Sequence, residues 1–350
     1  MYSDIFYIKD IKKNVFDNES KYLIFIAEDS KEMFNELERM DIKFYGAIFP
    51  QIIFDKQNYT NGAIIFKLKE YVEPFIIENI KDDITQFKTN ITGANSLITI
   101  VDGLSDVIDY FLEEFYEIID STTKIIGGGA GLLTLKQEPV IFSNDGIYED
   151  SALIIPLKDN IEIGVQHGWE KIYGPLVSTY TQKNILKTID YENAFEVYKE
   201  IVEKDSNQKF TEDNFFDISK KYPIGIEKIN GEVIVRDPIA RDGNDLILVG
   251  QMDQNSVIYI LKGESDKLIQ SASKVSKSLM QDKKEIEYIF LVDCISRVLF
   301  LEDKFEEEIQ AVKNSDNDTQ LFGILTLGEI ANNSKTYIEF YNKTCVVGIG

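Results

Sequence analysis

The fold is decided by a stretch that begins with YIFLVDCISR (residues 288–297) and continues with LFGILTLGE (residues 321–329). The apolar runs Tyr288 to Val292 and Leu321 to Leu325 are typical of buried strands. Between them, an amphipathic acidic helix is predicted from about residue 303 to residue 313. A closing hairpin is predicted after the second strand. The stretch therefore predicts a strand–helix–strand unit followed by a hairpin.

The same unit occurs twice earlier, beginning with the apolar strands YLIFIA (residues 22–27) and LITIV (residues 97–101). Each unit reaches a glycine-containing junction after its helix, and the three junctions align at Gly46, Gly127 and Gly323. Repeated βαβ units also occur in α/β proteins without a shared origin. The common order of elements in three places favours an internal pseudo-symmetry.

Composition indicates a soluble, globular protein. The chain has 350 residues, 44% of them hydrophobic, and a net charge of -23. This charge disfavours binding to nucleic acid and to anionic membranes. The apolar runs are far shorter than the roughly 20 residues of a membrane span, and the N-terminus lacks a signal-peptide core. The two cysteines, Cys294 and Cys345, do not make a disulfide framework, so we expect a cytoplasmic protein.

We predict an α/β (α+β) fold with two domains of mixed sheets, flanked by helices and built from the repeated units. The first domain is predicted to cover residues 1–185 and the second residues 186–350. The boundary precedes a helix predicted at residues 192–204, which carries an apolar face.

Several stretches, taken in order, resemble the FIST family of bacterial sensory domains. They are GGGAG (127–131), VIFSNDGIYEDSALIIPL (140–157), GVQHGWEKIYGP (164–175), ENAFEVYKE (192–200), VRDPIARDGNDLILVGQM (235–252), DCISR (293–297), LTLGEI (325–330) and YNKT (341–344). The resemblance implies a non-enzymatic intracellular module that binds a small ligand, with an amino acid the usual suggestion. Longer relatives carry output domains, whereas no kinase, cyclase or methyl-accepting segment is expected after Gly350. The signal is therefore expected to pass to a partner protein such as a histidine kinase or a cyclase.

The glycine run that includes Gly127, Gly128 and Gly129 is the first candidate for ligand contact. We expect a turn after a strand, where backbone N–H groups converge on an anion and a ligand approaches closely. No lysine-serine or GxGxxG pattern completes a nucleotide motif. The alternative is a tight packing junction between the strand and the hairpin.

Arg297 and Glu329 form the second candidate, because both follow predicted strands and ligands gather at strand ends in α/β sheets. A guanidinium suits a ligand carboxylate, and a carboxylate suits a ligand ammonium, so the two would fit a zwitterion such as an amino acid. The alternative is that these two residues pair with each other. Neighbouring candidates for ligand contact are Cys294, Asn342 and Arg236, the last being also a candidate for an interdomain ion pair.

Catalysis and cofactor binding receive less support from the sequence. Cys294 would need a nearby base to act as a nucleophile, and the single histidine, His167, lies far away in sequence. His167 shares the parity of Ile161, Ile163 and Val165, which predicts an inward-facing strand position. Since some FIST relatives look like haem-binding gas sensors for nitric oxide, His167 is the haem-ligand alternative; otherwise no cofactor is expected. No histidine or cysteine cluster predicts a metal site, and the run Glu306 to Glu308 is predicted to face solvent.

Overall fold

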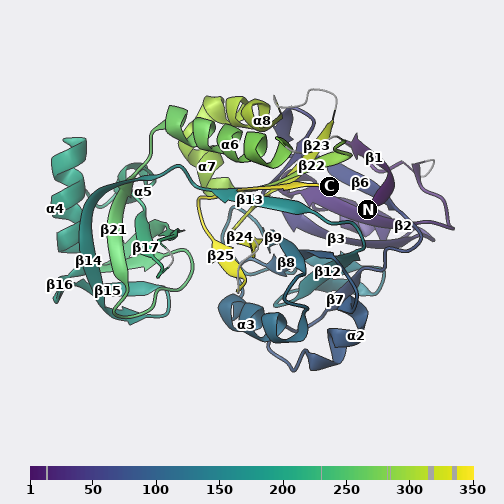
Figure 1. Cartoon of the computed structure of the whole chain (residues 1–350), viewed down its shortest axis with the longest axis horizontal. Helices are drawn as coiled ribbons and strands as arrows, with labels where there is room; N and C mark the ends of the chain where they lie inside the picture. The colour runs from purple at the N-terminus through teal and green to yellow at the C-terminus, as the bar shows by residue number, and fades with distance from the viewer. Residues whose placement is uncertain (13–14, 230, 282, 284, 314–318, 333–336) are drawn as a thin grey trace.

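The computed structural model describes residues 1–12, 15–229, 231–281, 283, 285–313, 319–332 and 337–350. These residues form two bodies (Figure 1). The three-sheet body contains residues 2–166 and 265–349, and the second body contains residues 170–262. Both chain termini lie in the three-sheet body (Figure 1). The predicted fold class, mixed sheets flanked by helices in two parts, is confirmed.

Each sheet of the three-sheet body has the same centre, in which two parallel strands of one unit are joined by an antiparallel strand of that unit. These strands are β2 (Lys21–Ala27), β3 (Lys43–Phe49) and β6 (Ala63–Leu68); β8 (Ser96–Asp102), β9 (Lys124–Ala130) and β12 (Ala152–Leu157); and β22 (Tyr288–Cys294), β23 (Gln320–Thr326) and β26 (Cys345–Ile349). The repeated units predicted from sequence are therefore present in the structure.

The hairpin of each unit leaves its own sheet and pairs with the next one. Hairpin β4–β5 (Gln51–Phe54, Gln57–Tyr59) pairs with β23, hairpin β10–β11 (Ile141–Ser143, Gly146–Tyr148) with β3, and hairpin β24–β25 (Glu329–Ala331, Glu339–Tyr341) with β9. The exchange closes a cycle, so each sheet depends on two units. Strands β1 (Tyr2–Ile8), β7 (Phe75–Ile77) and β13 (Glu162–Gln166) complete the sheets as outer strands.

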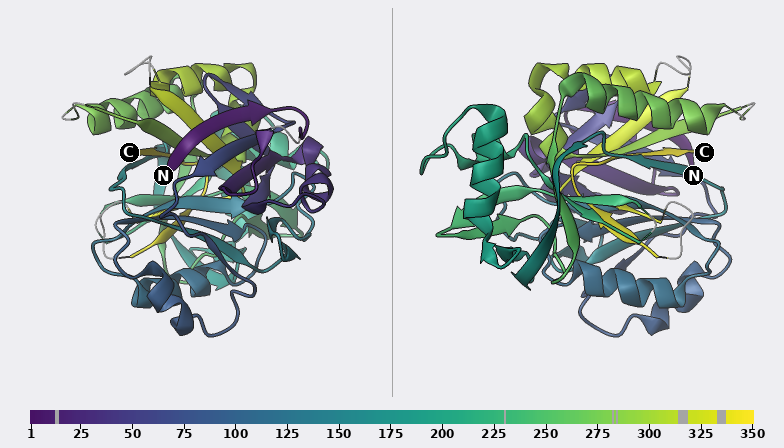
Figure 2. Two further views of the ribbon diagram at one scale, coloured as in Figure 1. Left: turned by 90° about the vertical axis from the view of Figure 1, so that its right-hand side faces the viewer. Right: turned by 60° about the vertical axis from the view of Figure 1, so that its left-hand side comes forward.

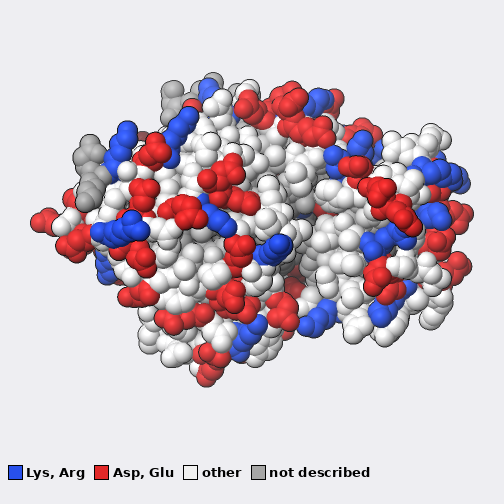
Figure 3. All heavy atoms as spheres, turned by 180° about the vertical axis from the view of Figure 1, so that it is seen from behind, with Lys and Arg blue, Asp and Glu red and all other residues white. Residues whose placement is uncertain are grey.

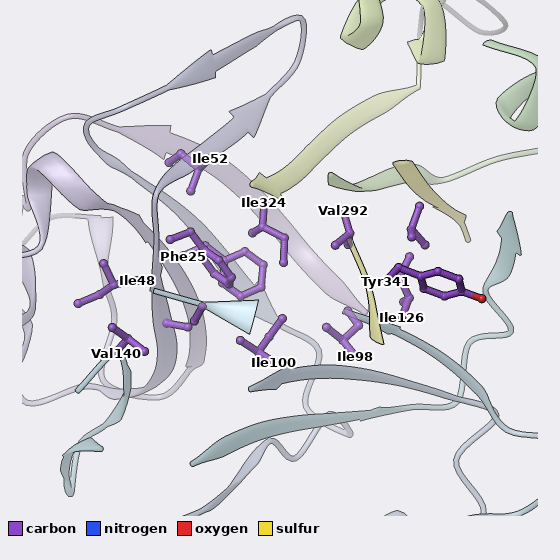
Figure 4. Close-up of a cluster of buried hydrophobic side chains, with 14 of the residues drawn as sticks. Phe25, Ile48, Ile52, Ile98, Ile100, Ile126, Val140, Val292, Ile324 and Tyr341 are labelled. Atoms are coloured by element: carbon purple, nitrogen blue, oxygen red, sulfur yellow. The ribbon is translucent and has the colours of Figure 1, made fainter. Parts of the chain in front are cut away.

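The three sheets enclose one apolar core, since their inner faces carry branched aliphatic and aromatic side chains. Phe25, Ile100 and the pair Ile52 and Ile324, which together represent all three sheets, converge there with no exposed surface (Figure 4). Helices cover the outer faces (Figure 2). They are α1 (Met33–Leu37), α2 (Lys88–Ile91), α3 (Ile108–Ile118), α6 (Ser265–Met280), α7 (Ile295–Leu301) and α8 (Phe305–Lys313).

The second body is an eight-stranded sheet with α4 (Ala194–Ser206) and α5 (Phe215–Ser219) packed against it. Its strands are β14 (Glu170–Gln182), β15 (Ile185–Ile189), β16 (Glu192–Asn193), β17 (Ile224–Glu227), β18 (Val233–Arg236), β19 (Pro238–Asp242), β20 (Asp245–Leu248) and β21 (Val257–Lys262). Residue 185 is the first residue of β15, and the division at this point stays a prediction. Within the described residues, no helix has the length and apolar character needed to cross a membrane.

Candidate functional site

A cavity of about 530 Å³ lies between the two bodies. Seen from behind, the surface is hollowed between the larger and the smaller body (Figure 3). The three-sheet body contributes residues 103–106, 108 and 109, which follow β8, and residues 294–296, which begin with the last residue of β22. The second body contributes residues 248–251, at the end of β20. Strands β8 and β22, each a member of a parallel pair in its own sheet, thus end at the cavity. The carboxyl ends of parallel strands are where α/β sheets commonly bind ligands.

Asp109 is a carboxylate on this cavity without a partner. It lies in the first turn of α3 and lines the cavity. Among the residues that the structure describes, none makes a hydrogen bond or an ion pair with it. Burial raises the pKa of its carboxyl, and the nearby Arg236 guanidinium opposes that shift. A cationic group of a ligand would supply the missing partner.

Asn342 has an unpaired hydrogen-bond donor, whereas Asp109 has an unpaired acceptor, in the part of the chain that the structure describes. Its side chain lines the cavity and is 1% exposed, yet Nδ2 has no hydrogen-bond partner in the described part of the chain. Its Oδ1 accepts from Arg236 Nη1 at 3.5 Å. A buried N–H donor without an acceptor is costly, so Asn342 carries an unsatisfied donor in the wall of the cavity.

Arg236 lies directly behind this wall of the cavity. A side chain added at Gly250, which lines the cavity, would meet Arg236 Nε and Asn342 Oδ1, both at 3.1 Å. Arg236 donates to the carbonyl oxygens of Gln251 (2.7 Å) and Phe340 (3.2 Å), while its Nη2 has no acceptor among the described residues. Arg236, a ligand-contact candidate from the sequence, therefore links the two bodies, and its Nη2 could still donate a hydrogen bond.

Cys294 and Glu329 lie together at the inner end of the cavity. Cys294 lines it, and its thiol hydrogen-bonds to the Glu329 carboxyl. Glu329 is fully buried and accepts from Thr326 Oγ1 (3.0 Å) and the Thr344 N–H (3.1 Å). Burial raises the pKa of the Cys294 thiol well above its usual value, and the Glu329 charge adds to this. A buried thiol of this kind is a weak nucleophile.

The pKa of Glu329 is raised to about 8, chiefly by burial. Between about pH 4.5 and pH 8, the Glu329 carboxyl is therefore protonated in the folded chain and ionised in the unfolded chain. Stability should fall as pH rises from about 4.5 to 8, by at most roughly 1.4 kcal/mol per pH unit from this group. Glu329→Gln should lose this slope, as measured by urea unfolding at pH 5, 6, 7 and 8. The exposed Glu306→Gln serves as control, and parallel profiles of wild type and Glu329→Gln would refute the assignment.

Arg297 faces away from the cavity. It is fully buried, and its Nε and Nη2 donate to Glu308 Oε1 at 3.0 and 2.6 Å. Asp293 Oδ1 lies 3.2 Å from Nε, and the carbonyls of His167 and Lys343 accept from Nη1 at 2.6 and 3.2 Å. The alternative that Arg297 pairs with Glu329 is wrong, because Glu308 and Asp293 are its partners. The prediction that Glu308 faces solvent is also wrong, since Glu308 is fully buried.

One buried group has the composition of a metal site. Asp293, Glu308 and Cys345 place their ligand atoms within 4.8 Å of one another. The guanidinium of Arg297 already supplies positive charge to both carboxylates. These residues fit an ion-pair network better than a metal centre.

The glycine run is part of a strand. Gly127, Gly128 and Gly129 lie within β9, so the predicted turn is wrong for them. A Cβ on Gly127 would lie 1.8 Å from the Thr99 carbonyl oxygen, and one on Gly129 would lie 2.6 Å from Gly103 Cα. Close packing of backbone on backbone therefore accounts for these glycines. Gly129 lies behind Gly103, which lines the cavity.

His167 lies one residue beyond β13, which ends at Gln166, so the strand position predicted for it is wrong. Its Nδ1 accepts from the Trp169 N–H at 3.0 Å. Burial and the nearby Arg297 charge lower the pKa of the imidazole to about 4. His167 does not line the cavity between the bodies. Haem ligation by His167 stays a prediction without geometric support at this cavity.

A second ion-pair cluster joins the two bodies beside the cavity. Asp237, in the second body, accepts from Ser296 Oγ at 3.0 Å and lies 3.0 Å from Lys343 Nζ. At the cavity mouth, Lys183 of the second body pairs with Asp106 of the three-sheet body at 3.0 Å. Sequence reasoning missed Asp109, Asp237 and Lys343. The sequence pattern that could have identified these three residues was weak, because each is adjacent to residues that were considered for other roles.

Family comparison divides the chain into two matched stretches. The FIST N domain model matches residues 21–192, and the FIST C domain model matches residues 194–332. Comparison with curated proteins finds no match. The two stretches meet in space at the cavity, since both contribute lining residues.

Proposed function

Because the chain belongs to the FIST family, whose domains are sensory modules for small ligands in signal transduction, we propose that it senses an amino acid bound between its two bodies. The family is not known as a catalytic one, and the weakly nucleophilic thiol of Cys294 agrees with a binding role. The observation that carries the proposal is that Asp109 and Asn342 line one cavity, and that the Asp109 carboxylate and the Asn342 side-chain N–H have no hydrogen-bond partner among the described residues.

The two groups match the two ends of a zwitterion. Asp109 would hold the ammonium, since it lines the cavity and its carboxylate has no hydrogen-bond or ion-pair partner in the part of the chain that the structure describes. The Nδ2 of Asn342 would donate to the carboxylate, with the positive charge of Arg236 directly behind it. The Asp109 carboxylate and the Arg236 guanidinium already interact electrostatically across this region. A bound amino acid would therefore have its ammonium next to a negative group and its carboxylate next to a positive one.

Signalling would follow from the position of the ligand. The cavity is lined by both bodies, and ion pairs such as Lys183–Asp106 cross between them. A ligand shifts the relative population of two arrangements only by its difference in affinity for them. Binding between the bodies supplies such a difference, and a partner protein such as a histidine kinase or a cyclase would respond to the favoured arrangement.

Asp109→Asn tests the ammonium contact. Loss of the charge should weaken amino-acid binding at least roughly 30-fold, equivalent to about 2 kcal/mol, as measured by calorimetric titration. The variant should fold, because it removes a charge that burial disfavours. The exposed Asp213→Asn is the matched control and should bind as the wild type does.

The carboxylate contact has its own test in the ligand. An amino-acid amide keeps the ammonium and loses the carboxylate charge, so it should bind more weakly than the parent amino acid. The proposal would be refuted if no amino acid binds the wild-type chain at millimolar concentration, or if Asp109→Asn binds as tightly as the wild type.

A further inference from the structure

The polar groups occupy only part of the cavity wall. The remainder is apolar and comes from both bodies: Leu104, Ile108, Leu133, Leu135, Ile295, Leu299, Leu327 and Phe340 from the first, and Phe216, Ile239, Leu248 and Val249 from the second. A volume of about 530 Å³ falls within the roughly 300–1,000 Å³ typical of ligand sites. An ammonium and a carboxylate alone would leave most of this wall uncovered.

Part of this wall is exposed to solvent. Leu133, Leu135 and Leu299 are 43%, 51% and 38% exposed, and all three line the cavity. Within the described residues they are the exposed leucines of the molecule. Single exposed apolar residues are ordinary, whereas a cluster at one concave site marks a surface that something covers.

We infer that the ligand is an amino acid with a large apolar side chain, which covers Leu133, Leu135 and Leu299 while its charged end lies at Asp109 and Asn342. This inference rests on the proposed function and adds the substrate class. Acidic ligands are disfavoured, because the Asp109 carboxylate lines the cavity, the Asp106 carboxylate already pairs with Lys183, and the chain carries a net charge of -23. Small amino acids would leave the leucines uncovered.

Calorimetric titration of the wild-type chain with glycine, alanine, leucine, phenylalanine and glutamate tests the inference. Each further buried carbon is worth roughly fourfold in affinity, so leucine should bind roughly 60-fold more tightly than alanine. Phenylalanine should also exceed alanine, and glutamate should bind most weakly. If alanine and leucine bind within twofold, or if glutamate binds more tightly than leucine, this inference fails and the proposed function stands. If none of the five binds, the inference fails, and titration with the remaining amino acids decides whether the proposed function fails with it.

Leu299→Ser separates the apolar contact from the charged one. Leu299 is partly exposed, so the variant should remain folded, which circular dichroism would check. The preference for leucine over alanine should fall at least fivefold, while the affinity for alanine stays the same. Val257→Ser, at a position 40% exposed and outside the cavity, is the matched control. An unchanged leucine preference in Leu299→Ser would overturn the assignment of this wall to the ligand side chain.

Discussion

Arg297→Met should destabilise the chain by roughly 3–5 kcal/mol, the usual cost of removing one partner from a buried charge network. The guanidinium is fully buried, and it is the cation that faces Glu308 and Asp293 in this network. Methionine fills similar space and leaves two carboxylates in the core with no counter-charge. It also leaves the carbonyls of His167 and Lys343 without their donor.

Urea unfolding followed by the fluorescence of the single tryptophan, Trp169, would measure the loss. Trp169 is buried and donates from Nε1 to the Lys343 carbonyl at 2.9 Å, so it reports on the same region. Part of the stability should return at low pH, because burial and the Glu308 charge raise the pKa of Asp293 well above its usual value. The double variant Arg297→Met/Glu308→Gln should lose less than the single one, since it removes one uncompensated charge.

The control is an ion pair on the surface. Lys304 lies 3.1 Å from Asp266, and the two side chains are 48% and 77% exposed. Lys304→Met should therefore change the unfolding free energy by less than about 1 kcal/mol. A loss below about 1 kcal/mol for Arg297→Met as well would contradict a structural role for this network.

The sequence predicted the repeated units because each begins with a short apolar run between polar residues, a pattern typical of a buried strand. Strands β2, β8 and β22 begin or end within two residues of the predicted limits. The exchange of hairpins was beyond prediction, since alternation along a strand indicates which face is buried and not which strand pairs with it. Chain order alone would place each hairpin in its own sheet.

The partner of Arg297 shows where pattern reasoning stopped short. Glu308 belongs to an acidic run, which suggested a solvated face, and Glu306 and Glu307 are indeed exposed. Helical spacing gives the opposite answer for Glu308, because it shares one face with Phe305, Ile309 and Val312, all buried. A charged residue on an apolar helical face predicts a buried partner, and Arg297 was the cation available.

The candidate site was predicted in part. Cys294 and Asn342 line the cavity, with Glu329 and Arg236 directly behind them, whereas Arg297 does not reach it. Asp109 was missed because it lies in the first turn of a helix, where an acidic residue normally has a capping or dipole role. Its significance comes from the second body, whose residues 248–251 line the same cavity, and no local sequence pattern predicts that the two bodies meet there.

Gly127→Ala should destabilise the chain by about 3 kcal/mol or more, the upper range for overpacking in a core. Gly127 pairs with Thr99, as Gly46 pairs with Ile24 and Gly323 with Leu291, at the same register point of each parallel pair. A Cβ would lie 1.8 Å from the Thr99 carbonyl oxygen, and the obstructing atom is backbone, which cannot move without separating β8 from β9.

The three aligned glycines make this prediction a test of the pseudo-symmetry. Gly46→Ala and Gly323→Ala place a Cβ 2.1 and 2.2 Å from the corresponding carbonyl oxygens, so they should be destabilising to a similar degree in urea unfolding. At Gly93 the nearest atom is Lys158 Nζ at 3.5 Å, and Gly93→Ala should cost about 1–2 kcal/mol for its φ of +77°. If Gly127→Ala is no worse than Gly93→Ala, the close approach of β8 and β9 is wrong. Strand β9 also pairs with β24, where Glu329 faces Gly128. If β8 and β9 separate, the amino-acid binding proposed above should therefore weaken together with stability.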